Sequence, residues 1–376
     1  MPKRPGLDDG ASEDALMEQA LHAISNKQSA EAVILGLAKK FDLDLAALFF
    51  SNMNYRQMAP LVNLDPSQGL LDAPHFELYR SRIPTTLFRD IIPDIYKMLL
   101  EYGPMDFHDT LEARSRFLSP IFNCLVPCFG SHIRNTPGTL LGGRWTTKGR
   151  AEYQFIVLGI VSILFVQFKP DTGSAVERFN AIAQLIAECD AGDFANQRND
   201  LQDPIYGILC DGETFEFFMF SPNTESSDRP SFFYGSLNTP TGREFRMSLP
   251  RFDGMFSSIG FMRVLRPICE VIFDLFLKSY IECLTQHYNI SKERSKSGPN
   301  RANLGGWEAA INNAKVALDM CRRADQHRAA SEWESCSSKA ESGMRMLEAS
   351  VIAVPRARPR SIPDELAKYE AMFDQF

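Results

Sequence analysis

Residues 149–171, GRAEYQFIVLGIVSILFVQFKPD, constrain the fold of this chain more than any other stretch. Two runs rich in β-branched and aromatic residues flank Gly159-Ile160, with glycine where a type II′ turn places its first central residue. The pattern predicts a β-hairpin in which residue 158 faces residue 161. Counted outward from that turn, Glu152 faces Gln167.

Polar residues interrupt this apolar hairpin at one end. Side chains alternate between the faces of a strand, so Gln167 and Lys169 project to the same side, and the pairing brings Glu152 to join them. The three groups form a candidate site. The alternative is a strand end that emerges into solvent, with Glu152 in an exposed cross-strand salt bridge.

A helix and a second hairpin are predicted directly after this site. Ser174 and Glu177 have the spacing of a capping box, and the helix that follows buries Phe179, Ile182, Ala183 and Ile186 along one face. The segment PIYGILCDGETFEFFMF then predicts a buried strand, an Asp-Gly turn and an aromatic return strand. The order is therefore hairpin, helix, strand.

This order, together with the polar triplet, resembles the PD-(D/E)xK nuclease superfamily over roughly residues 107–222. Glu152 matches the first acid of that family, and Gln167, Phe168 and Lys169 match its D/E-x-K triplet. The Q-x-K form is similar to the Mrr-type branch of restriction endonucleases. The segment also resembles nuclease-like domains of fungal transposon-associated and Crinkler-type proteins.

The resemblance implies metal-dependent cleavage of nucleic acid, with DNA as the expected substrate. Glu152, the amide oxygen of Gln167 and the backbone carbonyl of Phe168 would bind Mg²⁺ or Mn²⁺, and Lys169 would orient the attacking water. Gln184, on the following helix, is the candidate for a family glutamine that reaches toward the site. Because Gln167 carries no charge, a catalytically inactive module that binds protein or nucleic acid is the alternative.

Overall charge limits how the chain could hold a nucleic acid. The 376 residues carry a formal net charge of −7, so contact with phosphate must depend on a local basic patch. Arg144, Lys148 and Arg150, just before the hairpin, are the candidates, and a solvated loop is the alternative.

Cysteine usage and hydropathy indicate an intracellular protein, nuclear or cytoplasmic. Eight cysteines include no CxxC pair, and several lie in apolar runs, as buried reduced thiols do. Cys124, Cys128 and His132 have metal-ligand spacing, but structural burial is the favoured interpretation. No apolar run reaches membrane-spanning length, so we expect no membrane segment.

The predicted fold class is α/β (α+β), a restriction-endonuclease-like mixed sheet flanked by helices. A long apolar helix is expected within the core. The C-terminal helical segment is expected to be an appended element that packs on or beside the core, outside the active site, and is a candidate surface for a protein partner or self-association. The predicted regions are a disordered 1–12, a helical 13–106, the nuclease-like core 107–288, a basic linker 289–304, the C-terminal helical segment 305–350 and a tail 351–376.

Overall fold

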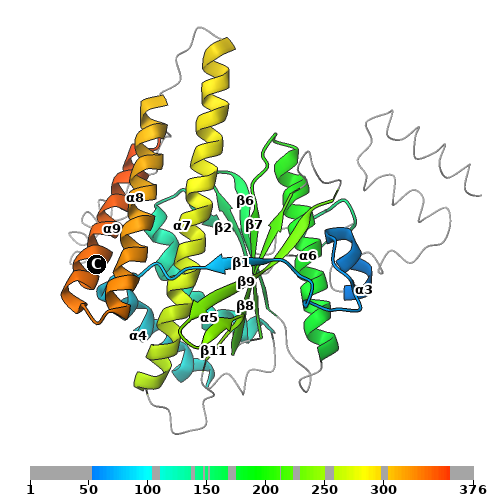
Figure 1. The fold of residues 1–376 in the computed structure, drawn as a ribbon, viewed down its shortest axis with the longest axis horizontal. Helices are drawn as coiled ribbons and strands as arrows, with labels where there is room; N and C mark the ends of the chain where they lie inside the picture. Colours follow the sequence, from blue (N-terminus) through cyan, green and yellow to red (C-terminus); the bar gives the residue numbers. More distant parts are fainter. Residues whose placement is uncertain are drawn as a thin grey trace, which may run out of the picture.

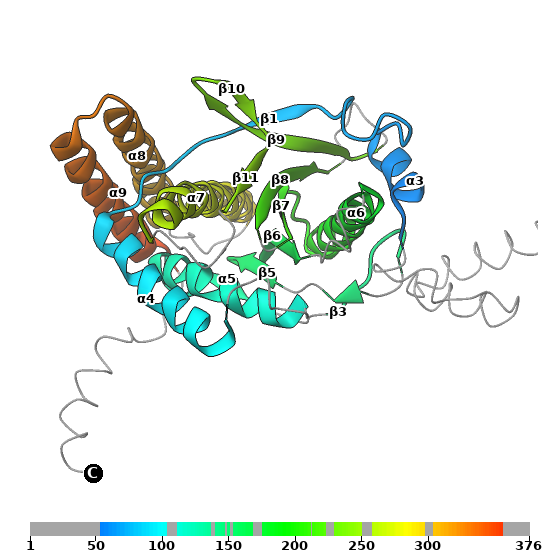
Figure 2. The same cartoon turned by 90° about the horizontal axis from the view of Figure 1, so that it is seen from below.

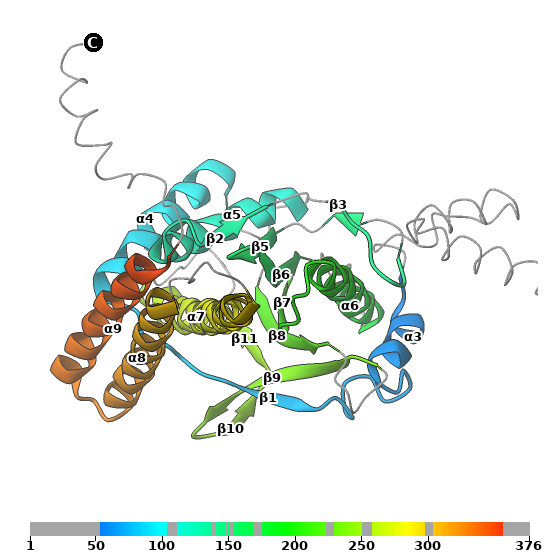
Figure 3. The same cartoon turned by 90° about the horizontal axis from the view of Figure 1, so that it is seen from above.

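A computed structural model shows a mixed β-sheet between two helical layers (Figure 1). Seen along the sheet, α6 (Ala175–Gln197) covers one face, and the remaining long helices cover the other (Figures 2 and 3). The described residues are 53–103, 111–136, 140–146, 149–150, 153–167, 175–211, 213–222, 229–249, 258–297 and 304–355. None of the helices in these ranges is long and apolar enough to cross a membrane.

The main sheet has nine strands in the described residues, and its central path runs β1-β9-β8-β7-β6-β5-β2, with β10 beside β9 and β11 beside β8. This confirms the predicted mixed α/β sheet flanked by helices. The strands are β1 (His75–Leu78), β2 (Ile133–Asn135), β5 (Tyr153–Val157), β6 (Ile160–Gln167), β7 (Ile205–Cys210), β8 (Thr214–Ser221), β9 (Ser231–Thr239), β10 (Gly242–Glu244) and β11 (Arg246–Ser248). Two short strands, β3 (Leu140–Leu141) and β4 (Gly149–Arg150), pair separately.

The β5–β6 hairpin is present, but its predicted register is wrong. The turn residues are Leu158 and Gly159, whose φ angles of 52° and 97° give the two positive values of a type I′ turn. Val157 therefore pairs with Ile160, and the register shifts once more at a bulge beside Phe155. Burial of its side chain and a hydrogen bond from its N–H to the carbonyl of His132, at 2.8 Å, hold Leu158 in this strained conformation.

The register change removes the basis for pairing Glu152 with Gln167. Tyr153 pairs with Phe165, where the predicted turn would have paired it with residue 166. Glu152 itself lies outside the described residues. In the described part of the hairpin, the pairing is therefore not the one from which the proximity of Glu152 and Gln167 was predicted.

The predicted helix and second hairpin are confirmed. Strand β7 lies parallel to β6, with Ile163 beside Tyr206 and Gln167 beside Cys210, and β8 returns antiparallel. Helix α6 packs Ile182, Ala183 and Ile186 against this region, as predicted. Ser174, the proposed cap, lies outside the described residues.

Close packing fixes α6 on the sheet. Leu185 lies over Gly207 of β7, and a Cβ atom at that glycine would meet the Leu185 Cδ2 atom at 2.7 Å. On the same helix, Asn196 donates to the carbonyl of Val161 and accepts from its N–H, both at 2.8 Å. These hydrogen bonds from the Asn196 side chain pair the backbone N–H and C=O of Val161, at the beginning of β6.

The opposite face is covered by a larger helical layer. It consists of α4 (Thr85–Tyr102), α5 (Leu111–Leu125) with the 3₁₀ turn η5 (Val126–Phe129), α7 (Ser258–Ser297), α8 (Leu304–Ala329) and α9 (Trp333–Ala353). Aromatic rings fill the centre of this layer, where Phe155 of β5 meets Phe276 of α7 edge-on at 4.9 Å. The long apolar helix of the predicted core is thus present as α7.

Helix α7 extends further than the sequence pattern suggested. It continues to Ser297, so residues 289–297 of the predicted linker 289–304 are helical. The physical reason is local: from Ile268 to Ser297 the chain has neither glycine nor proline, and the lysine, glutamate and arginine of the basic segment are good helix formers.

The C-terminal segment folds as two helices that share the main core. A turn with Ser331 at a φ of 63° separates α8 from α9. Trp307 and Leu347 belong to the same buried cluster as the α7 residues, and Arg322 of α8 donates twice to the buried Asp274 of α7, at 2.8 Å each. The predicted packing of this segment on the core is therefore confirmed, and two helices rather than one make the contact.

An ion-pair cluster joins the N-terminal part of the chain to α7. Glu270 is fully buried and accepts from Arg80 at 2.6 Å, from Arg82 at 2.9 Å and from Arg266 at 3.0 Å. Arg80 and Arg82 follow β1, which pairs in parallel with β9 at the edge of the sheet. The predicted helical region 13–106 therefore contributes a strand to the sheet; residues 1–52 lie outside the described residues.

Candidate functional site

The carboxyl ends of β6 and β7 meet at one edge of the sheet. Gln167 is the last residue of β6 and lies beside Cys210, the last residue of β7. In open α/β sheets this edge is where ligands commonly bind. The other predicted site residues, Glu152, Phe168 and Lys169, lie outside the described residues.

A carboxylate that directly follows β7 at this edge is used by a turn. Asp211 follows Cys210, and its Oδ1 atom accepts from the N–H groups of Glu213 at 2.9 Å and Thr214 at 2.6 Å. Within the part of the chain that the structure describes, no group of three or more His, Cys, Asp or Glu side chains is arranged to hold a metal ion. A metal site at this edge depends on residues 152 and 167–169.

The cysteine and histidine set with metal-ligand spacing has other contacts. The Cys128 thiol donates to the carbonyl of Cys124 at 3.5 Å, and burial raises the pKa of this thiol to about 12. His132 Nε2 lies 3.3 Å from the carbonyl oxygen of Val351 in α9. These contacts agree with the favoured structural interpretation.

Arg144, a predicted phosphate ligand, is held by two buried carboxylates of α6. Its guanidinium contacts Asp190 and Asp193, each at 2.5 Å, and its backbone N–H donates to Asp190 at 2.7 Å. Burial acts to lower the pKa of Arg144, but its bonds to the two aspartates outweigh burial and raise it. The arginine anchors its loop on α6, which leaves less of its charge for phosphate. Lys148 lies outside the described residues, and Arg150 is described only as part of β4.

Gln184, the predicted helix glutamine, makes a contact within α6. Its Nε2 atom donates to Glu188 Oε1 at 2.9 Å, and Glu188 is fully buried. The helix covers the sheet face that carries Leu164 and Leu209, whereas Cys210 belongs to the core of the opposite face. Gln184 and the residues buried beside Cys210 therefore lie on different sides of the sheet.

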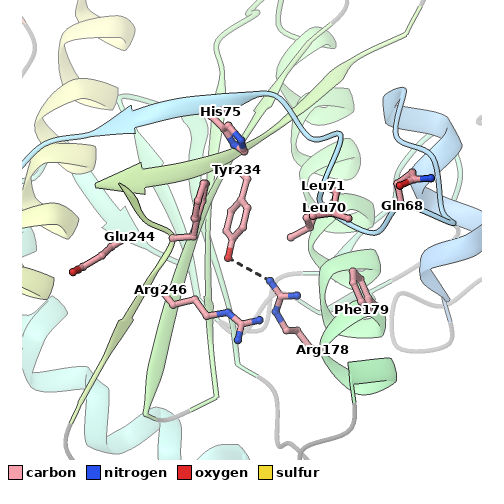
Figure 4. Close-up of a pocket in the computed structure, with 10 residues that line it drawn as sticks. Gln68, Leu70, Leu71, His75, Arg178, Phe179, Tyr234, Glu244 and Arg246 are labelled. Atoms are coloured by element: carbon pink, nitrogen blue, oxygen red, sulfur yellow. Dashed lines mark hydrogen bonds between the residues drawn. The ribbon is translucent and has the colours of Figure 1, made fainter. Parts of the chain in front are cut away.

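Sequence reasoning missed an open pocket of about 830 Å³ at the first turns of α6. Figure 4 shows its walls: Leu70, Leu71 and Phe179 on one side, and Tyr234 and Arg246 of the sheet on the other. The pocket is lined by Gln68, Leu70, Leu71, His75, Arg178, Phe179, Tyr234, Glu244, Phe245 and Arg246. Its walls come from four separate parts of the chain.

Two arginines share one buried carboxylate at the floor of this pocket. Arg178 holds Glu216 of β8 by two bonds, one of them 2.7 Å, and Arg246 lies 3.4 Å from the same carboxylate. Tyr234 donates to Glu216 at 2.5 Å. Burial acts to lower the pKa of Arg178, but the hydrogen bonds and charge of Glu216 raise it overall. The guanidinium group of Arg178 therefore stays charged.

Aromatic rings extend across the sheet side of the pocket. Phe245 lies 4.9 Å from His75 and 4.9 Å from Tyr234, and Tyr234 stacks on Phe218 at 5.0 Å. On the other wall, Phe179 packs on Tyr55 of α3 (Tyr55–Met58) at 4.8 Å. The sequence signal for this site is the interleaving of basic and aromatic residues in REFR, residues 243–246.

Comparisons with known proteins found a weak structural similarity. No family model and no curated protein matches the chain. Among solved structures, the chain is similar to one described as the cryo-EM structure of a DrdV–DNA complex, with 9% sequence identity and a TM-score of 0.27. The match covers 73% of this chain and 27% of the other, so this chain spans about a quarter of that protein.

Proposed function

We propose that this chain is a metal-dependent nuclease-like protein that hydrolyses phosphodiester bonds of nucleic acid, with DNA as the substrate. The observation that carries the proposal is the order of elements around Gln167: an antiparallel hairpin β5–β6, the helix α6, and β7 parallel to β6. This is the order that the PD-(D/E)xK resemblance implies. It leaves Gln167 at the carboxyl edge of the sheet, where that family binds its metal.

The proposed ligand set suits a hard cation. Glu152 would supply a carboxylate oxygen, Gln167 an amide oxygen and Phe168 a backbone carbonyl, and Mg²⁺ or Mn²⁺ prefers such oxygen ligands. A bound metal would supply a water of lowered pKa and positive charge beside the phosphate. Lys169 would orient that water and stabilise developing negative charge. Lys148 and Arg150 would bind flanking phosphates as cations.

A cleavage assay with plasmid DNA and a single-stranded RNA tests the enzyme. Metal-dependent products should appear with Mg²⁺ or Mn²⁺ and disappear in Glu152→Ala and Lys169→Met. Glu341→Ala and Lys315→Met change exposed residues of α9 and α8 and are the matched controls. Cleavage that persists in both site variants would show that these residues are not the catalytic ones.

The second candidate function is a catalytically inactive nuclease-fold domain that binds nucleic acid or protein. The observed hairpin register favours it, because it removes the cross-strand pairing from which the three-residue site was inferred. The neutral Gln167 also lowers the charge available to a metal. Binding of labelled DNA without cleavage, equal in wild type and in Glu152→Ala, would select this function.

Gln167→Glu separates the two functions directly. If Gln167 is a metal ligand, restoring the carboxylate should strengthen Mg²⁺ and Mn²⁺ binding in a calorimetric titration, because a full negative charge attracts the ion more than an amide dipole. An increase of roughly tenfold corresponds to about 1.4 kcal/mol. Negligible binding by both proteins would rule out the ligand role.

A further inference from the structure

The pocket at the first turns of α6 has an excess of positive charge at its floor. Arg178 and Arg246 face a single buried carboxylate, Glu216, so the three groups together carry one net positive charge. The side chain of Arg178 is 18% exposed and that of Arg246 is 50% exposed, so ligand atoms can reach both. Figure 4 shows the two guanidinium groups pointing toward one another, while Glu244 points away from them.

The walls of the pocket suit a planar ring. Figure 4 shows Phe179 and the buried Tyr234 on opposite sides of the pocket. Phe245 is partly buried, lies 4.9 Å from Tyr234 and also lines the pocket, and the ring of His75 lies 4.9 Å from Phe245. Aromatic side chains stack on nucleobases of any sequence, because every base has a π-face. The volume of about 830 Å³ lies within the range of small-molecule sites.

We propose that this pocket binds a nucleotide, with its phosphate at Arg178 and Arg246 and its base between the aromatic walls. Guanidinium groups bind phosphate by charge-assisted, forked hydrogen bonds. The position of Arg178 in the first turn of α6 adds the positive end of the helix dipole on the same side. The combination of a flat apolar wall and a cationic floor matches a nucleotide better than a ligand with only one of these features.

The nucleotide site is independent of the proposed catalytic edge. The pocket lies on the α6 face of the sheet, where Tyr234 belongs to the core with Leu164 and Leu209. Cys210, beside Gln167, belongs to the core of the other face. The proposed nucleotide binding therefore does not depend on whether the chain cleaves nucleic acid. The binding test is done in EDTA, which excludes metal-dependent cleavage.

The experiment is a calorimetric titration of the full chain with dAMP, with inorganic phosphate alone and with adenosine alone. We expect dAMP to bind more tightly than either part. Arg246→Gln should weaken dAMP roughly tenfold or more and leave adenosine unchanged, because it removes a charge-assisted contact to phosphate. Phe245→Leu should weaken both dAMP and adenosine, because stacking is lost.

Arg243→Gln is the matched control. Arg243 is exposed on β10, three residues from Arg246, and does not line the pocket, so its loss should leave dAMP affinity unchanged. Arg178 is a poor test residue because its removal would leave the buried Glu216 with a single, half-exposed cation, Arg246. Equal loss of affinity in Arg243→Gln and Arg246→Gln would overturn the site, since general surface charge would then explain binding.

The same variants identify the source of the nucleotide. A short single-stranded oligonucleotide that binds more tightly than dAMP, and loses affinity in Arg246→Gln, supports a nucleotide held within a strand. Equal affinities support a free nucleotide. The proposal is overturned if the folded protein binds neither dAMP nor the oligonucleotide. It is also overturned if the protein binds a fatty acid such as dodecanoate in place of dAMP.

Discussion

Ending the chain at residue 303 should abolish stable folding of the remainder. The deletion removes α8 and α9, which the sequence pattern presents as an appended element. In the structure, Trp307, Ile311, Leu347 and Val354 are buried in the cluster that contains the α7 residues. The deletion therefore exposes the partner surface of α7 as well as removing the two helices.

The magnitude follows from burial and charge. Full burial of a large apolar side chain contributes roughly 1.5–3 kcal/mol, so the four residues together contribute roughly 6–12 kcal/mol. Asp274, 3% exposed in the full chain, also loses its ion pair with Arg322. The sum is comparable to the whole stability of a typical domain, about 5–15 kcal/mol.

Denaturant unfolding followed by circular dichroism checks this expectation, with a chain that ends at residue 355 as the control. A graded version uses Arg322→Met, which should destabilise by about 3 kcal/mol. The matched control is Arg323→Met at the next position, whose side chain is 58% exposed in a surface pair with Asp319 and should cost less than about 1 kcal/mol. A chain ending at 303 that unfolds cooperatively at the full-length midpoint would refute the shared core.

Three further predictions concern buried polar groups. Glu270→Gln leaves the three surrounding arginines without their common charge and should destabilise the protein by about 3 kcal/mol, whereas Glu341→Gln on the surface of α9 should not change the unfolding midpoint. Asn196→Ala should cost about 2 kcal/mol in urea unfolding, because the N–H and C=O of Val161 lose their amide partner; a neutral result would mean that water replaces it. Burial raises the pKa of Glu282 to about 7, so the folded state holds this proton more tightly than the unfolded chain, whose pKa is near 4.5. Stability should therefore fall as pH rises from about 4.5 to 7, by up to roughly 3 kcal/mol, and Glu282→Gln should flatten that slope in denaturation curves at pH 5 and pH 7.5.

Local patterns in the sequence determined the existence and type of the central elements. The alternation and branching of residues 153–167 are enough to form a hairpin, because β preference and face alternation act over a few residues. The three- and four-residue spacing of Ile182, Ala183 and Ile186 likewise determines the buried face of α6. These features need no knowledge of distant residues.

Tertiary packing decided the register of that hairpin. The turn moved by one residue because Leu158 gains burial and a bond to His132, a residue 26 positions earlier in the chain. Moving the turn by one residue shifts the pairing by two, and the bulge beside Phe155 shifts it back by one, so that Tyr153 pairs with Phe165 and not with the predicted residue 166. The contacts of Arg144 with Asp190 and Asp193 of α6 could not be predicted from local sequence either, because 46 and 49 residues separate them from the arginine.

The nucleotide pocket is also a product of tertiary structure alone. Its lining comes from residues 68–75, 178–179, 234 and 244–246, and none of these segments carries a complete binding pattern by itself. Sequence fixes which residues are basic or aromatic, as REFR shows, but not which of them meet across the sheet. Such contacts depend on strand order and on which residues the core buries, and the free energy of the whole fold determines both.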